Sequence, residues 1–216
     1  MSRLLALVLA VLPLVAFAED PVPIEQEPRH RLKFENEYVR YFDVELEPGY
    51  ESRYHWHRAD GVFVNIASSP TIAQDFGKEA VRRGERAIGE TYYIDYGVKP
   101  KAHRVSNPGT TPYHVVDTEI LKSCGPGTTG EGPNQSMLID NEHAFVTRVI
   151  LHPGESTVLS GPCGVLVAVS GGSVTLDAAK KVDLSPAGYI WRQQAEPVTL
   201  VNNGPYVLHA VDIRLK

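Results

Sequence analysis

The sequence contains an internal repeat, which restricts the folds open to this chain of 216 residues. Asn36-Glu37 recurs as Asn141-Glu142, and Pro48-Gly49 recurs as Pro153-Gly154, both at an offset of 105 residues. Near the end of each copy the offset is 95, where residues 107, 109, 114, 116 and 117 match residues 202, 204, 209, 211 and 212. Matches at two constant offsets predict two copies of one structural unit, with the second copy shorter in its middle.

Each copy alternates short apolar runs with glycine, proline and asparagine, and neither contains a long apolar stretch at helical spacing. Such runs, rich in Val, Ile, Tyr and Phe, are typical of β-strands. We expect strands at 41–46, 61–66, 90–94 and 113–121, and again at 147–151, 165–169, 173–176 and 207–215. Residues 78–87 fit either a short helix or a charged edge strand. Many short strands separated by turns predict an all-β sandwich or barrel.

Residues 1–18 have the features of a cleaved signal peptide. Arg3 precedes an apolar run over 4–15, and Ala16-Phe17-Ala18 is a small-x-small cleavage site. The run is short for a membrane span, so we expect a periplasmic or secreted product without membrane attachment, with an uncleaved anchor as the alternative. The remaining chain divides into a first barrel over 19–122, a Gly/Pro-rich linker over 123–136 and a second barrel over 137–216.

Charge and cysteine content limit the partners of such a protein. The net charge of −5 argues against a nucleic-acid partner, which leaves a small-molecule substrate or ligand. Cys124 and Cys163 are the two cysteines of the chain. Because an exporting compartment permits disulfides, they either form one bond or are two unrelated thiols.

The repeat also helps to distinguish structural residues from functional ones. Polar residues shared by both copies are expected to support the fold, and those found in only one copy are the better functional candidates. His114 and His209 occupy equivalent places, so we interpret both as structural. His55 and His57 are different: residues two apart in a strand share a face, so both imidazoles would project the same way. The offsets place Ser160, Pro162 and Val198 where His55, His57 and His103 stand, so all three histidines are absent from the second copy.

These segments resemble the two motifs of the cupin superfamily. Gly49, His55 and His57 match the opening of G-x5-H-x-H-x(3,4)-E-x6-G, and His103 and Asn107 match G-x5-P-x-G-x2-H-x3-N, with Gly97 and Pro100 fitting loosely. The resemblance covers nearly all of the chain after residue 18. It implies a two-domain cupin: two tandem jelly-roll barrels with little helix, the first binding one divalent metal through His55, His57 and His103, and the second lacking the ligands.

One ligand of the family motif is missing. Its glutamate falls on Gly61 or Val62, and neither side chain binds metal. Asp60 is the nearest carboxylate and a possible fourth ligand, although its odd spacing from His57 turns it away unless a bulge intervenes. Asp60, Asp95 and Asn107 are also the nearby candidates for fixing the histidine tautomers. Three imidazoles accept Fe, Mn, Zn, Ni or Cu and leave positions open for an oxygen ligand.

No general base or nucleophile stands out, and Tyr92 and Arg104 are the candidates for a catalytic proton donor and a carboxylate holder. Plain packing and a solvated surface are the alternatives for them. The leading interpretation is an exported metalloenzyme acting on a small oxygen-bearing molecule, by dioxygenase-type chemistry ahead of a metal-dependent lyase or isomerase. The alternatives are a non-catalytic metal- or ligand-binding module, whose second copy supports a homodimer, and a purely structural protein.

Overall fold

The structure is a computed structural model that describes residues 20–125, 130–193 and 196–216. The predicted signal peptide lies outside the described residues, as does part of the predicted linker. Apart from one short 3-10 helix, η1 (Ile24–Gln26), the regular structure of these ranges is strand. None of the helical structure described is long and apolar enough to cross a membrane.

The first copy forms two five-stranded sheets. The outer sheet has the order β1-β4-β9-β6-β7, and its strands are β1 Val22–Pro23, β4 His55–His57, β6 Thr71–Asp75, β7 Ala80–Arg83 and β9 Lys101–Ser106. The inner sheet has the order β2-β3-β10-β5-β8, and its strands are β2 His30–Glu35, β3 Val39–Leu46, β5 Asp60–Ala67, β8 Thr91–Ile94 and β10 Tyr113–Ile120. The open choice at 78–87 is settled, because β7 is an exposed edge strand.

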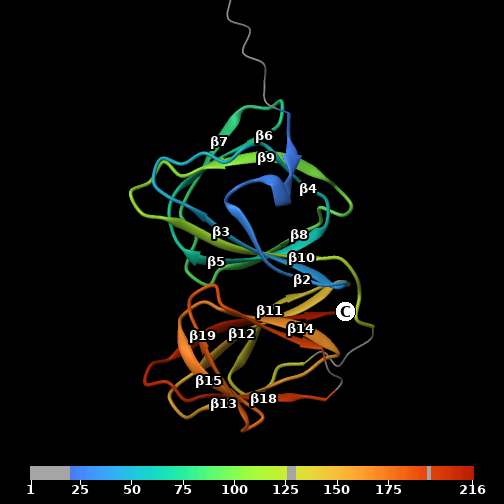
Figure 1. The fold of residues 1–216 in the computed structure, drawn as a ribbon, viewed down its shortest axis with the longest axis vertical. Coiled ribbons are helices and arrows are strands. Elements are labelled where there is room, and N and C mark those ends of the chain that lie inside the picture. The colour runs from blue at the N-terminus through green and yellow to red at the C-terminus, as the bar shows by residue number, and fades with distance from the viewer. Residues whose placement is uncertain (1–19, 126–129, 194–195) are drawn as a thin grey trace, which may run out of the picture.

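The second copy repeats this arrangement with one outer strand fewer. The inner sheet has the order β11-β12-β19-β14-β17, with β11 Gln135–Asp140, β12 Ala144–Leu151, β14 Cys163–Ala168, β17 Tyr189–Gln193 and β19 Leu208–Leu215. The outer sheet has the order β13-β18-β15-β16, with β13 Ser156–Leu159, β15 Gly172–Leu176, β16 Lys180–Leu184 and β18 Val198–Asn202. The predicted all-β fold with two jelly-roll barrels is confirmed (Figure 1).

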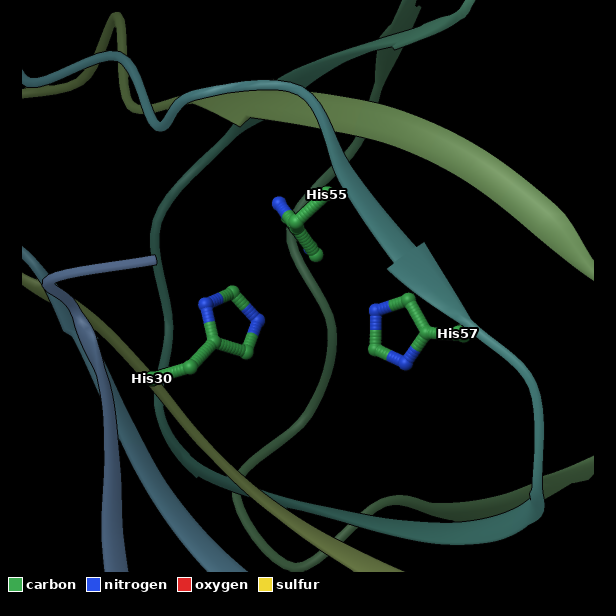
Figure 2. A group of neighbouring side chains, drawn as sticks. All are labelled: His30, His55 and His57. Carbon is green, nitrogen blue, oxygen red and sulfur yellow. The ribbon is translucent and has the colours of Figure 1, made fainter. Parts of the chain in front are cut away.

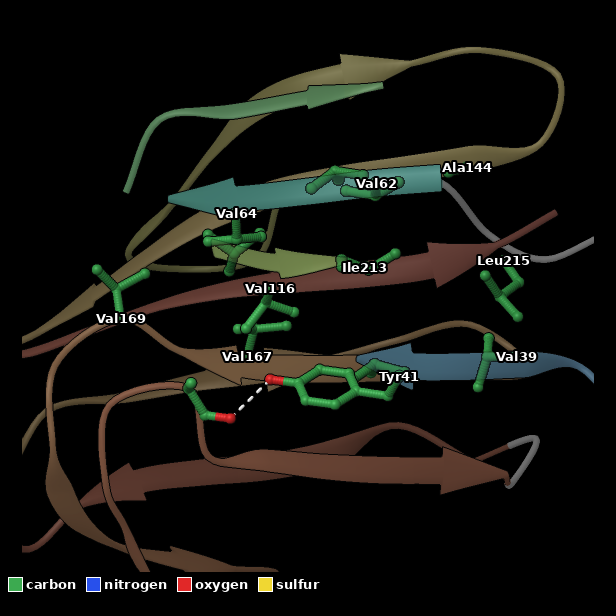
Figure 3. Packing of buried hydrophobic residues seen from close by; sticks show 14 of the residues in the cluster. Val39, Tyr41, Val62, Val64, Val116, Ala144, Val167, Val169, Ile213 and Leu215 are labelled. Atoms are coloured by element: carbon green, nitrogen blue, oxygen red, sulfur yellow. Dashed lines mark hydrogen bonds between the residues drawn. The ribbon is translucent and has the colours of Figure 1, made fainter. Parts of the chain in front are cut away.

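The two inner sheets pack against each other, as Figure 1 shows for β2 and β11. Strands such as β5 are buried on both faces, which explains their continuous apolar sequence. Val62, Val64 and Val116 of the first barrel share a core with Val167 and Ile213 of the second (Figure 3). Within this layer the Tyr41 hydroxyl donates a hydrogen bond to the Ala187 carbonyl oxygen at 2.7 Å (Figure 3). The barrels are therefore joined by a shared apolar layer.

A disulfide between Cys124 and Cys163 ties the segment after β10 to the first residue of β14. Of the two sequence-based alternatives for the cysteines, the bonded pair is the one confirmed. Because Cys163 itself lies in the shared apolar layer and is 1% exposed, the bond fixes the connecting segment directly against the interface between the barrels.

Candidate metal centre

Strands β4 and β9 bring the three predicted histidines together. Their antiparallel register pairs His55 with His103, and side chains of directly paired residues lie on one face of a sheet. His57 shares that face because it is two residues from His55, while Trp56 between them is turned the other way. The ring centroids of His55, His57 and His103 lie 4.9 to 5.1 Å from one another.

A fourth histidine, which the motifs do not contain, joins this group. His30, the first residue of β2, has its ring centroid 4.2 Å from that of His55 and 5.9 Å from that of His57. One nitrogen from each of His30, His55 and His57 lies within 4.8 Å of the others, which suits a shared metal ion. Figure 2 shows the three rings facing one space between the strands. Among the described residues His103 belongs to no such group of donor atoms, although its ring touches theirs.

The surroundings orient these rings. His30 Nδ1 lies 2.7 Å from a carboxylate oxygen of Glu27, and His55 Nδ1 lies 2.9 Å from the carbonyl oxygen of Arg53. His57 Nδ1 faces a carboxylate oxygen of Asp117 at 3.4 Å. With Nδ1 of His30 and of His55 each bonded to an acceptor, the Nε2 lone pair of these two rings is the one left for a metal.

Several of the nitrogens have no hydrogen-bond partner. His55 Nε2, His57 Nδ1 and His103 Nδ1 are buried without one. Buried polar atoms in proteins are nearly always bonded, so each such atom needs an explanation. A divalent transition metal supplies one, because imidazole nitrogen is a common ligand for these ions. The residues present therefore fit a metal ion held by histidines.

Electrostatics keep these imidazoles neutral, which is the form that binds metals. Burial lowers the pKa of His30 well below its usual value, and the neighbouring His57 lowers it further. Burial likewise lowers the pKa of His55 and of His103, with the adjacent histidines adding to the effect. All three of these side chains therefore carry an unprotonated nitrogen at neutral pH.

The histidines lie at one side of a cavity of about 340 Å³ inside the first barrel. Its walls are largely aromatic and aliphatic, and include Phe63, Tyr92 and Tyr96, while Arg83 and Arg86 lie at its exposed edge. Tyr92 stacks on Phe63 with centroids 5.1 Å apart, and burial raises its pKa well above the usual value. The cavity thus offers a small molecule apolar walls beside the metal ligands, a typical form for a ligand site.

The segment at the edge of this cavity contacts the second barrel. Gly89, in the segment that carries Arg86, adopts a φ of +77°, and a Cβ atom there would lie 2.2 Å from Cε1 of His209. The Asn65 amide donates hydrogen bonds to the carbonyl oxygens of Arg86 and Ala87, at 3.1 Å each. Glycine is required at residue 89 both for this conformation and for the close approach.

Buried acidic residues lie next to His57. Asp117 and Glu119 of β10 are 1% and 0% exposed, and no carboxylate oxygen of either has a hydrogen-bond partner of good geometry. Arg40 lies 2.6 Å from Glu119 as its ion-pair partner. Burial and the neighbouring charge of Asp117 outweigh Arg40 and raise the pKa of Glu119 to about 8. Asp117, which lines the cavity, therefore faces His57 as an unpaired carboxylate.

Two of the predicted site residues lie elsewhere. Asp60 accepts a hydrogen bond from the Gly97 amide at 2.8 Å and lies 3.5 Å from His143 of the second barrel, so the structure does not bring it to the histidines. Arg104 follows His103 in β9 and therefore faces the other side of the sheet, where it pairs with Glu51 and bonds Gln74. Tyr92 is the candidate that the structure places in the cavity.

The predicted orienting residues also differ from those observed. Asn107 holds the neighbouring turns, because its amide donates to the carbonyl oxygens of Leu46 and Thr111 at 2.8 Å each. Asp95 is half-exposed and pairs with Lys99. The groups that bond the rings are Glu27 and the Arg53 carbonyl, while Asp117 lies 3.4 Å from His57 Nδ1.

Sequence reasoning missed His30, although a signal was present. At the offset of 105 its counterpart is Gln135, and the register confirms the match, since His30 pairs with Val44 as Gln135 pairs with Val149. His30 is thus another polar residue found in the first copy only. Asp117 was missed for the opposite reason: its counterpart Asp212 is also an aspartate.

The second barrel has no such cluster among its described residues. Its strand pairing corrects the sequence alignment by one residue: Leu159 pairs with Val198 as His55 pairs with His103, so Leu159 rather than Ser160 is the counterpart of His55. The reason is that Leu159 lies five positions after Gly154, whereas His55 lies six positions after Gly49. Leu159 and Val198 belong to the apolar core of the second barrel.

Comparisons with known proteins agree with this architecture. No family model matches the chain, and no curated protein matches it in sequence. Among solved structures, AerE from Microcystis aeruginosa is similar with a TM-score of 0.65 and 13% identity over 91% of this chain and 98% of that one. YhaK from Escherichia coli has a TM-score of 0.57 and 16% identity, covering 85% and 87%.

A salicylate 1,2-dioxygenase from Pseudaminobacter salicylatoxidans is also similar, with a TM-score of 0.59 and 11% identity over 90% of this chain and 81% of that one. These identities are too low to carry an activity across, and they show the fold alone. The chain therefore shares the two-barrel fold of these structures, which agrees with the cupin resemblance of its sequence motifs.

Proposed function

We propose that this protein is an exported, metal-dependent enzyme that acts on a small oxygen-bearing molecule, by chemistry of the dioxygenase type. The observation that carries the proposal is the convergence of buried imidazoles, with unpartnered nitrogens, beside a cavity of about 340 Å³. His55, His57 and His103 are the proposed ligands. A bound metal would supply Lewis-acid polarisation of an oxygen atom and, with a redox-active ion, electron exchange with dioxygen.

The chain's own residues would bind and orient the substrate. Phe63, Tyr92 and Tyr96 give the cavity flat apolar walls that exclude water, and Arg83 makes no ion pair among the described residues. A small ring or chain that carries an anionic group fits these walls and this guanidinium. One protein of this fold, salicylate 1,2-dioxygenase, has been observed with gentisate, which makes hydroxybenzoates sensible members of a substrate panel.

A second candidate is a metal-dependent lyase or isomerase. The observation in its favour is Asp117, a cavity-lining carboxylate whose oxygens make no hydrogen bond. Reactions without a redox step need a group that accepts a proton from the substrate, and an unpaired carboxylate within the cavity suits that role. Export itself is supported by the disulfide, which forms in oxidising compartments.

The first test is elemental analysis of the protein purified from its export compartment, followed by oxygen uptake with thiols, diketones, flavonols and hydroxybenzoates. We expect about one equivalent of a transition metal, lost in His57→Ala, and oxygen consumption with at least one class. Metal-free wild-type protein that takes up no added ion would refute the metal proposal. Bound metal with product formed but no oxygen consumed would assign the lyase or isomerase instead.

A further inference from the structure

His30 enters the metal centre from the opposite side of the barrel. It begins β2 of the inner sheet, whereas the other three histidines come from β4 and β9 of the outer sheet. Its side chain is 8% exposed, and its ring centroid is closer to that of His55 than the centroids of His57 and His103 are. The donor nitrogens of His30, His55 and His57 lie mutually within 4.8 Å.

The turn before β2 holds this ring in place. One oxygen of Glu27 accepts the backbone amides of Arg29 and His30, at 2.8 and 3.0 Å, and also faces His30 Nδ1 at 2.7 Å. Glu27 is 1% exposed, and its carboxylate lies 2.7 Å from the neutral His30 ring. The two backbone bonds fix the carboxylate whether or not the ring is present. Glu27 therefore selects the tautomer that leaves Nε2 of His30 free toward the other imidazoles.

The carboxylate ligand expected from the family motif is missing in this chain, which leaves a place for another ligand such as His30. Gly61 and Val62 replace the glutamate of the family motif, and Asp60 is engaged by the Gly97 amide. In the second barrel, which has lost the other histidines, the counterparts of Glu27 and His30 at the offset of 105 are Gly132 and Gln135. The pair thus occurs together with the three motif histidines and is absent where they are absent.

We propose that His30 is a fourth metal ligand, held in position by Glu27, and that it replaces the carboxylate ligand of the motif with a neutral nitrogen. This inference rests on the proposed metal centre. A site built from imidazoles alone keeps the full charge of the ion and favours Fe, Ni, Cu or Zn over Mg and Ca, which prefer oxygen ligands. Glu27 is a positioning residue, because it acts on the metal through His30.

The test compares metal-free protein reloaded with Cu(II) or Co(II) in four forms: wild type, His30→Phe, Glu27→Gln and His114→Phe. His114→Phe is the matched control, because His114 also pairs with a carboxylate, the partly buried Asp43 at 2.6 Å, on the same sheet but outside the cavity. Competition with a chromogenic chelator gives the affinity, and electron paramagnetic resonance counts the nitrogen ligands on Cu(II). Circular dichroism and thermal melting report folding of each variant.

We expect His30→Phe to lose one nitrogen from the Cu(II) spectrum and to bind about 100-fold more weakly, and Glu27→Gln to bind about tenfold more weakly with the nitrogen count unchanged. His114→Phe should bind as wild type does. An unchanged affinity and spectrum in His30→Phe would overturn the proposal. If that variant does not fold, an unchanged affinity in a folded Glu27→Gln protein would overturn it. Failure of the underlying metal centre is distinct, since wild type itself would then bind no ion.

Discussion

The two barrels have the same strand arrangement but different side chains in their interiors. At the position where His55 faces His103 in the first barrel, Leu159 faces Val198 in the second and belongs to a continuous apolar core. Both barrels keep an asparagine that holds the turn near the end of the repeat, Asn107 and Asn202, with matching bonds to two carbonyl oxygens. The framework is therefore independent of the site.

The contrast is clearest at one aspartate. In the second barrel Asp212 accepts hydrogen bonds from Arg192 and from Arg214, the latter at 2.8 Å. In the first barrel the counterpart of Arg214 is Glu119, and the strand register places Ile94 where Arg192 stands. Asp117 is consequently left without hydrogen bonds beside His57. The comparison teaches that equivalent aspartates differ in their partners: Asp212 is hydrogen-bonded by two arginines, whereas Asp117 is buried without a hydrogen bond.

The largest expected effect is on the stability of the second barrel. Arg214→Met leaves Asp212 buried with only one of its two arginine partners, so we expect the free energy of unfolding to fall by about 3–5 kcal/mol. Urea unfolding followed by tryptophan fluorescence measures it. Arg148→Met is the control, because Arg148 makes no ion pair among the described residues. Equal losses in both variants would contradict a special role for the Asp212 network.

The second effect concerns the disulfide, which is confined to the second barrel and its connecting segment. Cys124→Ala with Cys163→Ala frees a loop with a sequence separation of 39 residues. We expect a loss of about 2–4 kcal/mol, because the unfolded chain regains the entropy that the bond removes. Unfolding in urea with and without reductant measures this loss. The reductant should destabilise wild type and leave the double variant unchanged; sensitivity of the double variant would argue against the bond as the cause.

A third effect, spread over several pH units, should appear in the pH dependence of the stability of the first barrel. Burial and Asp117 raise the pKa of Glu119 to about 8, against Arg40 and with a further contribution from Glu25. The folded state therefore binds an extra proton above the unfolded pKa of about 4.5, so this contribution is full below pH 4.5 and lost as the pH rises through 8.

Glu119→Gln cannot lose a proton, so its stability relative to wild type should rise between pH 5 and pH 9, with a slope of up to about 1.4 kcal/mol per pH unit. Unfolding free energies of metal-free protein at several pH values test this. A difference between the two proteins that stays constant over the range would show that Glu119 is ionised throughout.

The smallest expected effect is that of Asp117→Asn on stability. Because neither oxygen of Asp117 is hydrogen-bonded, the neutral amide should change the free energy of unfolding by no more than about 1 kcal/mol. Asp212→Asn, the same change in the second barrel, is the matched control and should cost far more. Similar losses at both residues would end the distinction drawn between the two copies.

Much of the fold was predictable, because the sequence itself contains both the repeat and the short apolar runs that are bounded by turn residues. All eight expected strands are present, and some of those that were missed, such as β16 (Lys180–Leu184), are polar and largely exposed. The packing of one inner sheet on the other was not predictable, because an apolar strand does not reveal which surface covers its second face.

The candidate site was predictable only in part. His55, His57 and His103 lie in segments with recognisable spacing, and the structure brings their rings together. Arg104 was a weaker candidate, because successive residues of a strand point to opposite faces and Arg104 directly follows His103. His30 reaches the centre through the closure of the barrel, which brings together strands distant in sequence, and no local spacing encodes that contact.

The apolar layer between the barrels has a consequence for attempts to isolate the histidine-bearing half. A chain shortened after residue 122 would present Val62, Val64 and Val116 to water as a broad hydrophobic surface. It would also leave Gly89 without the imidazole it rests on, at the rim of the cavity. The second repeat, which has no such histidine cluster among its described residues, therefore covers the inner sheet of the first, and we expect the pair of barrels to be the smallest unit that keeps this sheet buried.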